Sequence, residues 1–236
     1  GKSTLMSLAT GLLRPTEGGV EVLGRPGFLA QGKPLYRGFT VEEMLRAGRL
    51  LNPDWDDEYA RRLVDEAGVP LGARIRTLSG GQRTRVALAV ALGRRPGVVL
   101  LDEPLADLDP LARQEVMRAP MAEVAETGTT VVLSSHVIAD LDGICDHLLL
   151  LSDGRVRLAG DVEDLLAEHR LLIGPRSLEV PAEVVVERRD AERQSTVLVR
   201  GLADLPDVEV VDPTLEELAL GYFRAGRTAA EREVAA

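Results

Sequence analysis

The chain has 236 residues, of which 45% are hydrophobic and 28% are charged. This length can bury a sizeable core in one large or two modest domains, and the balance excludes a disordered chain. The formal net charge of −10 disfavours nucleic acid as a partner, because phosphate binding requires clustered Lys and Arg. No apolar run approaches the roughly 18–20 residues needed to cross a bilayer. The single cysteine, Cys145, excludes an intramolecular disulfide, no secretory signal opens the sequence, and we expect a cytoplasmic protein.

The first part of the sequence reads as mainly helical. In chain order we expect a helix at 1–13, a turn at 18–19 with a short strand at 20–23, a strand end at 28–30, and helices at 41–51, 54–67 and 83–93. Asn52 or Asp54 is the expected cap of the helix at 54–67, and Pro96-Gly97 ends the helix at 83–93.

The pattern changes at Val98–Leu101, an apolar run that ends in Asp102 and Glu103, as in a buried parallel strand with polar chemistry at its carboxyl end. The expected elements that follow are a helix at 111–126, a strand at 130–133, a helix at 137–145, a hairpin of strands at 147–151 and 155–158, and a capped helix at 161–168. Strands that alternate with helices predict an α/β core with a mostly parallel sheet. Pro120 lies inside an expected helix, so we expect a bend or break near Ala119.

Beyond Pro175 the sequence predicts short strands at 184–186, 196–199 and 208–211, a helix near 214–223, and ten frayed residues at the end. We therefore expect a main domain at 1–170, with a helical subdomain at about 35–95, and a small α+β extension at 171–236.

Two short motifs point to nucleotide chemistry. Gly1-Lys2-Ser3-Thr4 resembles the end of a phosphate-binding loop, in which a helix start cradles phosphates, a lysine reaches the outer phosphates and a hydroxyl holds Mg²⁺. The alternative is an ordinary helix cap or a tag remnant. Val98–Glu103 resembles the second nucleotide motif, with Asp102 for Mg²⁺ and Glu103 for the attacking water. Two acids that solvate a strand end are the alternative there.

The tract Leu78-Ser79-Gly80-Gly81-Gln82 identifies the family that the sequence resembles. LSGGQ is the signature of ABC-type ATPases, and it stands here unaltered. Ser79 is the expected helix cap, and the two glycines let the backbone approach a γ-phosphate at the helix N-terminus. Beside the other motifs, a plain Ser-Gly-Gly turn before a helix is the weaker interpretation.

Further positions match the family in order. Gln31 resembles the Q-loop glutamine, Asp109 the D-loop aspartate and His136 the switch histidine. The resemblance implies catalytic roles for Glu103, His136 and Gln31, nucleotide contacts for Gly1, Lys2, Ser3, Thr4, Ser79, Gly80, Gly81, Gln82 and Asp109, and Mg²⁺ contacts for Ser3, Gln31 and Asp102. His147, His169 and Cys145 match no family motif.

Two features depart from the family pattern. The chain opens inside the phosphate loop, so we expect an N-terminally truncated sequence that binds ATP poorly, although the complete protein should bind it. Ala106 and Asp107 stand where the family usually has a small hydroxyl residue and a Gly or Ala.

The resemblance implies an ABC transporter ATP-binding subunit that hydrolyses ATP with Mg²⁺. Its site is split between two copies, so a second ATPase subunit is an expected partner, and a homodimer is favoured. A separate membrane permease, docked near residues 37–51, would hold it on the inner face of the cell membrane. The segment after 170 and the Ser134-Ser135-His136 tract resemble bacterial exporter ATPases, which predicts export. The alternatives are a soluble ABC ATPase that acts on ribosomes or DNA, and a scaffold without turnover.

Overall fold

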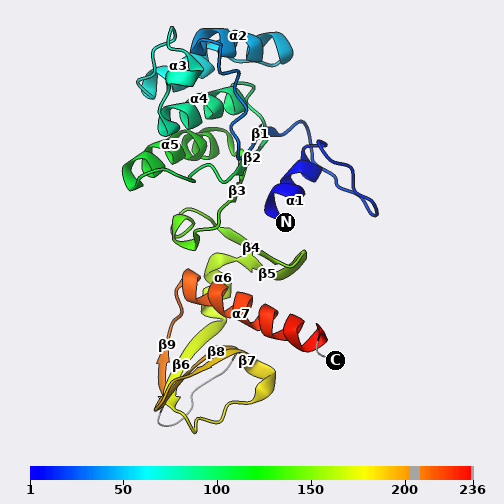
Figure 1. The fold of residues 1–236 in the computed structure, drawn as a ribbon, viewed down its shortest axis with the longest axis vertical. Coiled ribbons are helices and arrows are strands. Elements are labelled where there is room, and N and C mark those ends of the chain that lie inside the picture. The colour runs from blue at the N-terminus through cyan, green and yellow to red at the C-terminus, as the bar shows by residue number, and fades with distance from the viewer. Residues whose placement is uncertain (202–207, 235–236) are drawn as a thin grey trace. The chain divides into compact units, whose positions relative to one another are not determined.

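The structure is a computed structural model that describes residues 1–201 and 208–234 (Figure 1). The chain divides into two compact units, which we call the N-terminal unit (Lys2–His136) and the C-terminal unit (Val137–Ala236, with Gly1). Each is described by itself below.

The N-terminal unit is built on a parallel sheet of β1 (Gly27–Leu29), β2 (Val98–Asp102) and β3 (Thr130–Ser134), in that order. The central strand β2 is buried from Val99 to Asp102, which explains its continuous apolar sequence. In the register of the sheet, Leu29 lies beside Leu101, and Leu101 beside Leu133. The carboxyl ends of the three strands therefore lie at one edge of the sheet.

Helices surround this sheet. The unit contains α1 (Lys2–Ala9), α2 (Val41–Leu51), α3 (Asp57–Glu66), the 3₁₀ turn η1 (Ile75–Thr77), α4 (Gly80–Leu92) and α5 (Pro110–Thr127). Helix α1 contacts β2, α4 contacts β1 and α5 contacts β3, while α2, α3 and α4 pack on one another (Figure 1). These three helices lie between residues 41 and 92 and form one helical region.

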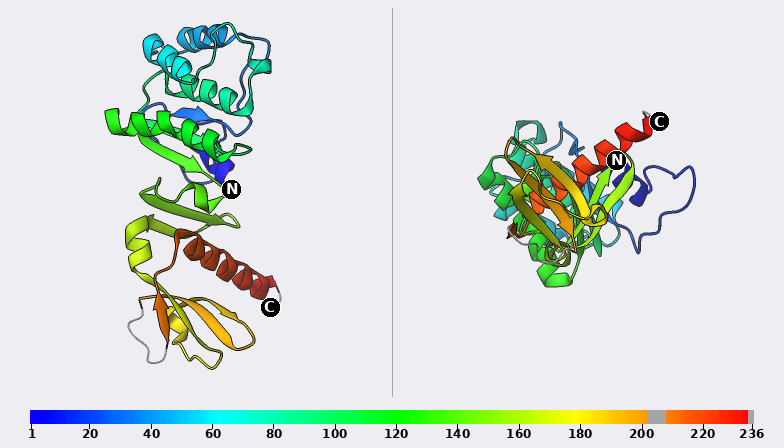
Figure 2. Two further views of the ribbon diagram at one scale, coloured as in Figure 1. Left: turned by 90° about the vertical axis from the view of Figure 1, so that its left-hand side faces the viewer. Right: turned by 90° about the horizontal axis from the view of Figure 1, so that it is seen from below.

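The C-terminal unit contains a hairpin and a second sheet. The hairpin pairs β4 (His147–Ser152) with β5 (Arg155–Asp161), and the antiparallel sheet has the order β7-β8-β6-β9. Its strands are β6 (His169–Pro175), β7 (Val185–Asp190), β8 (Gln194–Arg200) and β9 (Glu209–Val211), with α6 (Val162–Ala167), α7 (Leu215–Val234) and the 3₁₀ turns η2 (Ile138–Asp140) and η3 (Ala182–Val184). Helix α7 packs on β7, on the hairpin and on α6 (Figure 2).

Some elements differ from the expectations. The boundary between the two compact units falls between residues 136 and 137 rather than between 170 and 171. Residues 137–170 belong to the second unit because Leu148, Leu158 and Leu165 share one hydrophobic cluster with Leu198 and Leu218. The expected helix at 137–145 is only the short turn η2.

The strand expected at 20–23 is wrong. These residues form no regular structure, and Val20 and Leu23 are exposed. No described strand pairs with this segment, and an extended segment without a partner has nothing to satisfy its backbone groups except water. The sequence predicts a bend or break near Ala119; the break is wrong, because α5 continues through Pro120, and the bend stays a prediction. Pro120 is buried with Val116 and Met117, so tertiary packing stabilises a helix that propensity disfavours.

Candidate functional site

Polar side chains follow all three strands of the N-terminal sheet at their carboxyl ends. Gln31 comes two residues after β1, Asp102 ends β2 with Glu103 next, and His136 comes two residues after β3. Because the register places these ends side by side, residues from three distant parts of the sequence reach one edge of the sheet. This is the edge at which open parallel sheets bind ligands.

Glu103 lies at the centre of this edge. Its φ is +49°, in the left-handed region that non-glycine residues rarely adopt, and such backbone strain is concentrated at functional sites. Its backbone N–H donates to Ser134 Oγ at 2.9 Å, and Ser134 Oγ donates to Asp102 Oδ1 at 2.7 Å. One buried hydroxyl therefore fixes both acidic residues to the end of β3.

The Glu103 carboxylate contacts two other predicted site residues. Lys2 Nζ lies 3.6 Å from Glu103 Oε1, while the backbone N–H and ring Nδ1 of His136 lie 3.2 and 2.7 Å from Oε2. The Glu103 side chain is only 9% exposed, whereas that of His136 is 65% exposed. The structure thus brings Lys2, Asp102, Glu103 and His136 together: a cation, two carboxylates and an imidazole around a partly water-shielded position.

The phosphate-loop residues begin α1. Lys2 is the first residue of the helix, Ser3 and Thr4 follow in its first turn and are exposed, and Gly1 precedes it. Helix α1 contacts β2, so its N-terminal turn lies beside the carboxyl end of that strand. A helix N-terminus next to a lysine is a general anion-binding arrangement.

The signature residues begin α4. The Ser79 side chain accepts from the Gln82 backbone N–H at 3.2 Å, and the Gln82 side chain accepts from the Ser79 N–H at 3.1 Å, which forms a capping box. A Cβ added at Gly80 or Gly81 would meet only ordinary contacts, at 3.8 Å from Leu108 and 3.7 Å from Ala112. Packing within this chain therefore does not require glycine at either position.

Asp109 and Gln31 have simpler surroundings. Asp109 is the N-cap of α5, where its carboxylate accepts from the Ala112 N–H at 2.9 Å. That bond gives Asp109 a structural role whatever else it does. Gln31 is exposed in the turn after β1.

The donor set suits Mg²⁺ held jointly with a nucleotide. Among the described residues, no three His, Cys, Asp or Glu side chains are grouped so that they could hold a metal ion. Mg²⁺ in nucleotide sites typically takes only one or two protein oxygens and completes its shell with phosphates and water. The Asp102 carboxylate and the Ser3 hydroxyl are oxygens of that kind.

Ser134 is a site residue to which sequence reasoning assigned no role. Its hydroxyl bridges Asp102 and Glu103, and it faces Asp102 because the register pairs these two residues. The available signal was a hydroxyl residue at the end of a strand next to the acidic strand. Using that signal required knowledge that the two strands are neighbours.

The described part of the chain contains no helix that is both long enough and apolar enough to span a bilayer.

Comparison with known proteins supports one family. A family model described as ABC transporter matches residues 1–106. The chain is 34% identical to the energy-coupling factor transporter ATP-binding protein EcfA2 of Symbiobacterium thermophilum, over 98% of this chain and 84% of that protein. It is 36% identical to the aliphatic sulfonates import ATP-binding protein SsuB of Shigella flexneri, over 82% of this chain and 79% of that protein. It also matches the ABC transporter ATP-binding protein YtrB of Bacillus subtilis at 27% identity, over 72% of this chain but only 62% of YtrB.

Solved structures agree with these relatives. The ATP-binding subunit of an ABC transporter superposes with a TM-score of 0.62 and 26% identity, over 71% of this chain and 76% of that one. The cassette MJ0796 in a post-hydrolysis state with ADP and Pi gives 0.61 and 25%, over 69% of this chain and 81% of that one. With the nucleotide motifs gathered on a parallel sheet, the chain belongs to the ATP-binding subunits of ABC transporters, a family of ATPases.

Proposed function

We propose that this chain is the ATP-hydrolysing subunit that drives a transporter whose membrane-spanning permease is a separate chain. The observation that carries the proposal is the position of Glu103, buried beside Asp102 and in contact with both Lys2 and His136. This is the set of charges that phosphoryl transfer to water requires, because that chemistry depends on positioning and neutralisation of charge.

Each residue has a distinct role in the proposed reaction. The Glu103 carboxylate orients the attacking water and accepts its proton. Lys2, at the N-terminus of α1, neutralises the outer phosphates, and His136 holds the transferring phosphoryl group from the exposed side. Asp102 and Ser3 would hold Mg²⁺, which supplies positive charge to the phosphates when bound, and Gln31 completes this set from the end of β1.

We further propose that the complete site forms between two copies. Ser79–Gln82 and Asp109 form hydrogen bonds within the first turns of their own helices, and this chain's own packing does not require the two glycines of the signature. In this proposal they face the nucleotide of the other copy. The likeness to a dimeric form of the cassette MJ0796, with a TM-score of 0.59 and 25% identity, supports it.

The permease is proposed to dock beside α2 and the segment before it. Tyr36 and Phe39 are exposed and lie with ring centroids 5.1 Å apart, and Leu50 and Leu51 at the end of α2 are exposed as well. These exposed apolar side chains lie at the two ends of α2, and exposed apolar surface is typical of a site that another protein covers. Such docking would hold the subunit on the inner face of the cell membrane.

The direction of transport stays outside this proposal. Export was predicted from resemblance, but the relatives whose names state a direction are the import proteins for thiamine, molybdenum and aliphatic sulfonates. Those names describe those proteins, and they give export no support.

The test uses the full-length gene product with an affinity tag, purified from detergent-solubilised membranes and from cytosol. The proposal expects a multi-span membrane protein that stays bound through washing, and ATP hydrolysis by the purified complex. Recovery from cytosol alone or with ribosomes would contradict the transporter role and favour a soluble ABC ATPase.

A further inference from the structure

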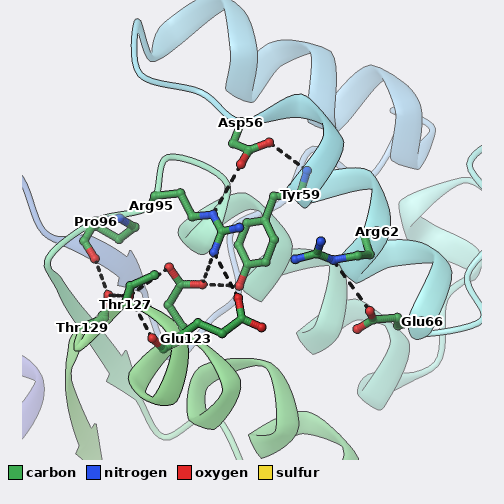
Figure 3. Close-up of polar contacts among 10 residues, drawn as sticks. Asp56, Tyr59, Arg62, Glu66, Arg95, Pro96, Glu123, Thr127 and Thr129 are labelled. Atoms are coloured by element: carbon green, nitrogen blue, oxygen red, sulfur yellow. Dashed lines mark hydrogen bonds and ion pairs between the residues drawn. The ribbon is translucent and has the colours of Figure 1, made fainter.

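Arg95 lies in a polar cluster with Asp56, Tyr59 and Glu123 (Figure 3). It follows the C-terminal end of α4 and has a φ of +49°, so its backbone is held in a conformation that non-glycine residues avoid. Its guanidinium carbon lies 3.4 Å from the centroid of the Tyr59 ring. The same group approaches Asp56 Oδ2 at 3.4 Å and Glu123 Oε2 at 3.0 Å.

Glu123 makes this cluster more than a surface ion pair. Its side chain is fully buried in α5, and its carboxylate accepts from the Tyr59 hydroxyl as well as from Arg95. Burial and the neighbouring carboxylate raise the pKa of Tyr59, so the phenol keeps its proton and remains the donor. Removing either donor would leave a buried carboxylate under-compensated. The three side chains therefore fix α5 to α3 and to the end of α4.

Hydrogen bonds to backbone carbonyls stabilise the same junction. The Asp56 N–H donates to the Gly93 carbonyl at 2.6 Å, and Thr129 Oγ1 donates to the Pro96 carbonyl at 3.0 Å. Gly93 lies against Trp55 so closely that a Cβ there would be 2.6 Å from its ring. These contacts hold the C-terminal ends of α4 and α5 close to each other.

The opposite ends of these two helices carry the residues proposed to act on the second copy. Helix α4 begins directly after Ser79 and α5 directly after Asp109. At 1.5 Å per residue, the 13-residue α4 is about 20 Å long, so a tilt of about 5° at Arg95 moves its N-terminus by roughly 2 Å. Misplacement of about 1 Å can slow an enzyme about 10²-fold.

We infer that Arg95, with Tyr59 and Glu123, is a positioning residue that sets the orientation of the signature and Asp109 toward the other copy's nucleotide. This inference rests on the proposed function. It assigns no contact with substrate to Arg95, which acts only through the two helices.

The test compares Arg95→Gln with Arg62→Gln in the full-length ATPase. Arg62 is a matched control, because its guanidinium carbon also lies over the Tyr59 ring, at 5.1 Å, and it pairs with Glu66 at 3.8 Å within α3. We expect Arg95→Gln to lower kcat per folded molecule by about ten- to a hundredfold. Its KM for ATP should stay within about twofold, because Lys2, Asp102 and Glu103 remain in place. Arg62→Gln should leave both constants unchanged.

Two results would overturn the inference: an unchanged kcat with a lower melting temperature, which describes a purely structural cluster, or a raised KM with an unchanged kcat. Should Arg95→Gln fail to fold, Tyr59→Phe decides, because it removes only the hydroxyl and keeps the ring. It should lower kcat several-fold, and an unchanged kcat would refute the inference.

Glu103→Gln in the same assay tests the proposed function separately. If it hydrolyses ATP like the wild type, the proposed function fails; if it is slow while Arg95→Gln is normal, only the inference fails.

Discussion

Replacing Ser134 by alanine should destabilise the N-terminal unit more than most single hydroxyl removals. Ser134 is buried, and its Oγ makes two hydrogen bonds, from the Glu103 N–H at 2.9 Å and to Asp102 Oδ1 at 2.7 Å. A bond to a charged group contributes about 1.5–3 kcal/mol and a neutral one about 1 kcal/mol, and alanine leaves both partners without the hydroxyl. The expected loss is therefore about 2.5–4 kcal/mol in the free energy of unfolding.

Thermal unfolding followed by tryptophan fluorescence measures this loss. Trp55 is the only tryptophan of the sequence and lies in the N-terminal unit, so its emission reports on the unit that contains Ser134. At about 2–4 °C per kcal/mol for a protein of this size, the melting temperature should fall by roughly 5–15 °C.

The matched control is Thr77→Val, which removes an exposed hydroxyl that donates to the Arg74 carbonyl at 2.7 Å in the same unit. Water replaces that bond, so the control should unfold close to the wild type. If Ser134→Ala also unfolds within about 0.5 kcal/mol of the wild type, the hydroxyl bridge does not hold the two acidic residues.

Three further outcomes follow from other groups. Glu103→Gln should slow ATP turnover by about 10²–10⁴-fold in a steady-state phosphate-release assay while nucleotide binding is retained, and unchanged turnover would remove Glu103 from the role of base. Burial lowers the pKa of His169 below its ordinary 6.5, so near this pH the unfolded chain binds a proton at this side chain more readily than the folded chain does. The free energy of unfolding, measured in urea, should therefore fall as the pH drops below about 6.5. His169→Gln should flatten this dependence and the exposed His147→Gln should preserve it; equal slopes in both variants would contradict the assignment. Partial burial raises the pKa of the Cys145 thiol, so a thiol reagent at pH 7 should label it more slowly in the folded protein than in urea, and equal rates would contradict this shift.

Local signals in the sequence were sufficient for much of the fold. The helix expected at 41–51 has those bounds in the structure, because Thr40 and Glu43 form a capping box and the apolar residues repeat at helical spacing. The apolar run at 98–101 became the central strand because it is buried on both faces. In both cases the information lies within a few residues of the element.

Pairing between distant residues is what the sequence could not supply. The strand expected at 20–23 failed because a strand depends on a partner that lies elsewhere in the chain. The start of the second compact unit was misplaced because the hairpin at 147–161 packs with residues some 50 positions later. The bond from Ser134 to Asp102 spans 32 residues, and the Arg95–Glu123 pair spans 28. Neither interaction can be predicted until it is known which strands and helices are neighbours.

In the site as well, local motifs identified some residues, whereas a contact between distant residues was missed. Motif matching named Lys2, Asp102, Glu103 and His136, and the structure brings these four together. The roles assigned to them, and to Gln31, remain predictions. Motif matching gave no sign of the buried hydroxyl that holds the acidic pair.

The central claim is that each ATP site is completed by a second copy, and mixing two inactive variants tests it most directly. Full-length Lys2→Ala lacks the ammonium of its own site, and Gly81→Asp places a carboxylate where the signature should meet a phosphate, with room for a Cβ at that position. A mixed dimer holds one intact site, formed by Lys2 of one variant and the signature of the other. Each variant alone should be inactive, and the account predicts that co-expression restores ATP hydrolysis. If the mixture stays as inactive as its parts, the composite site is contradicted.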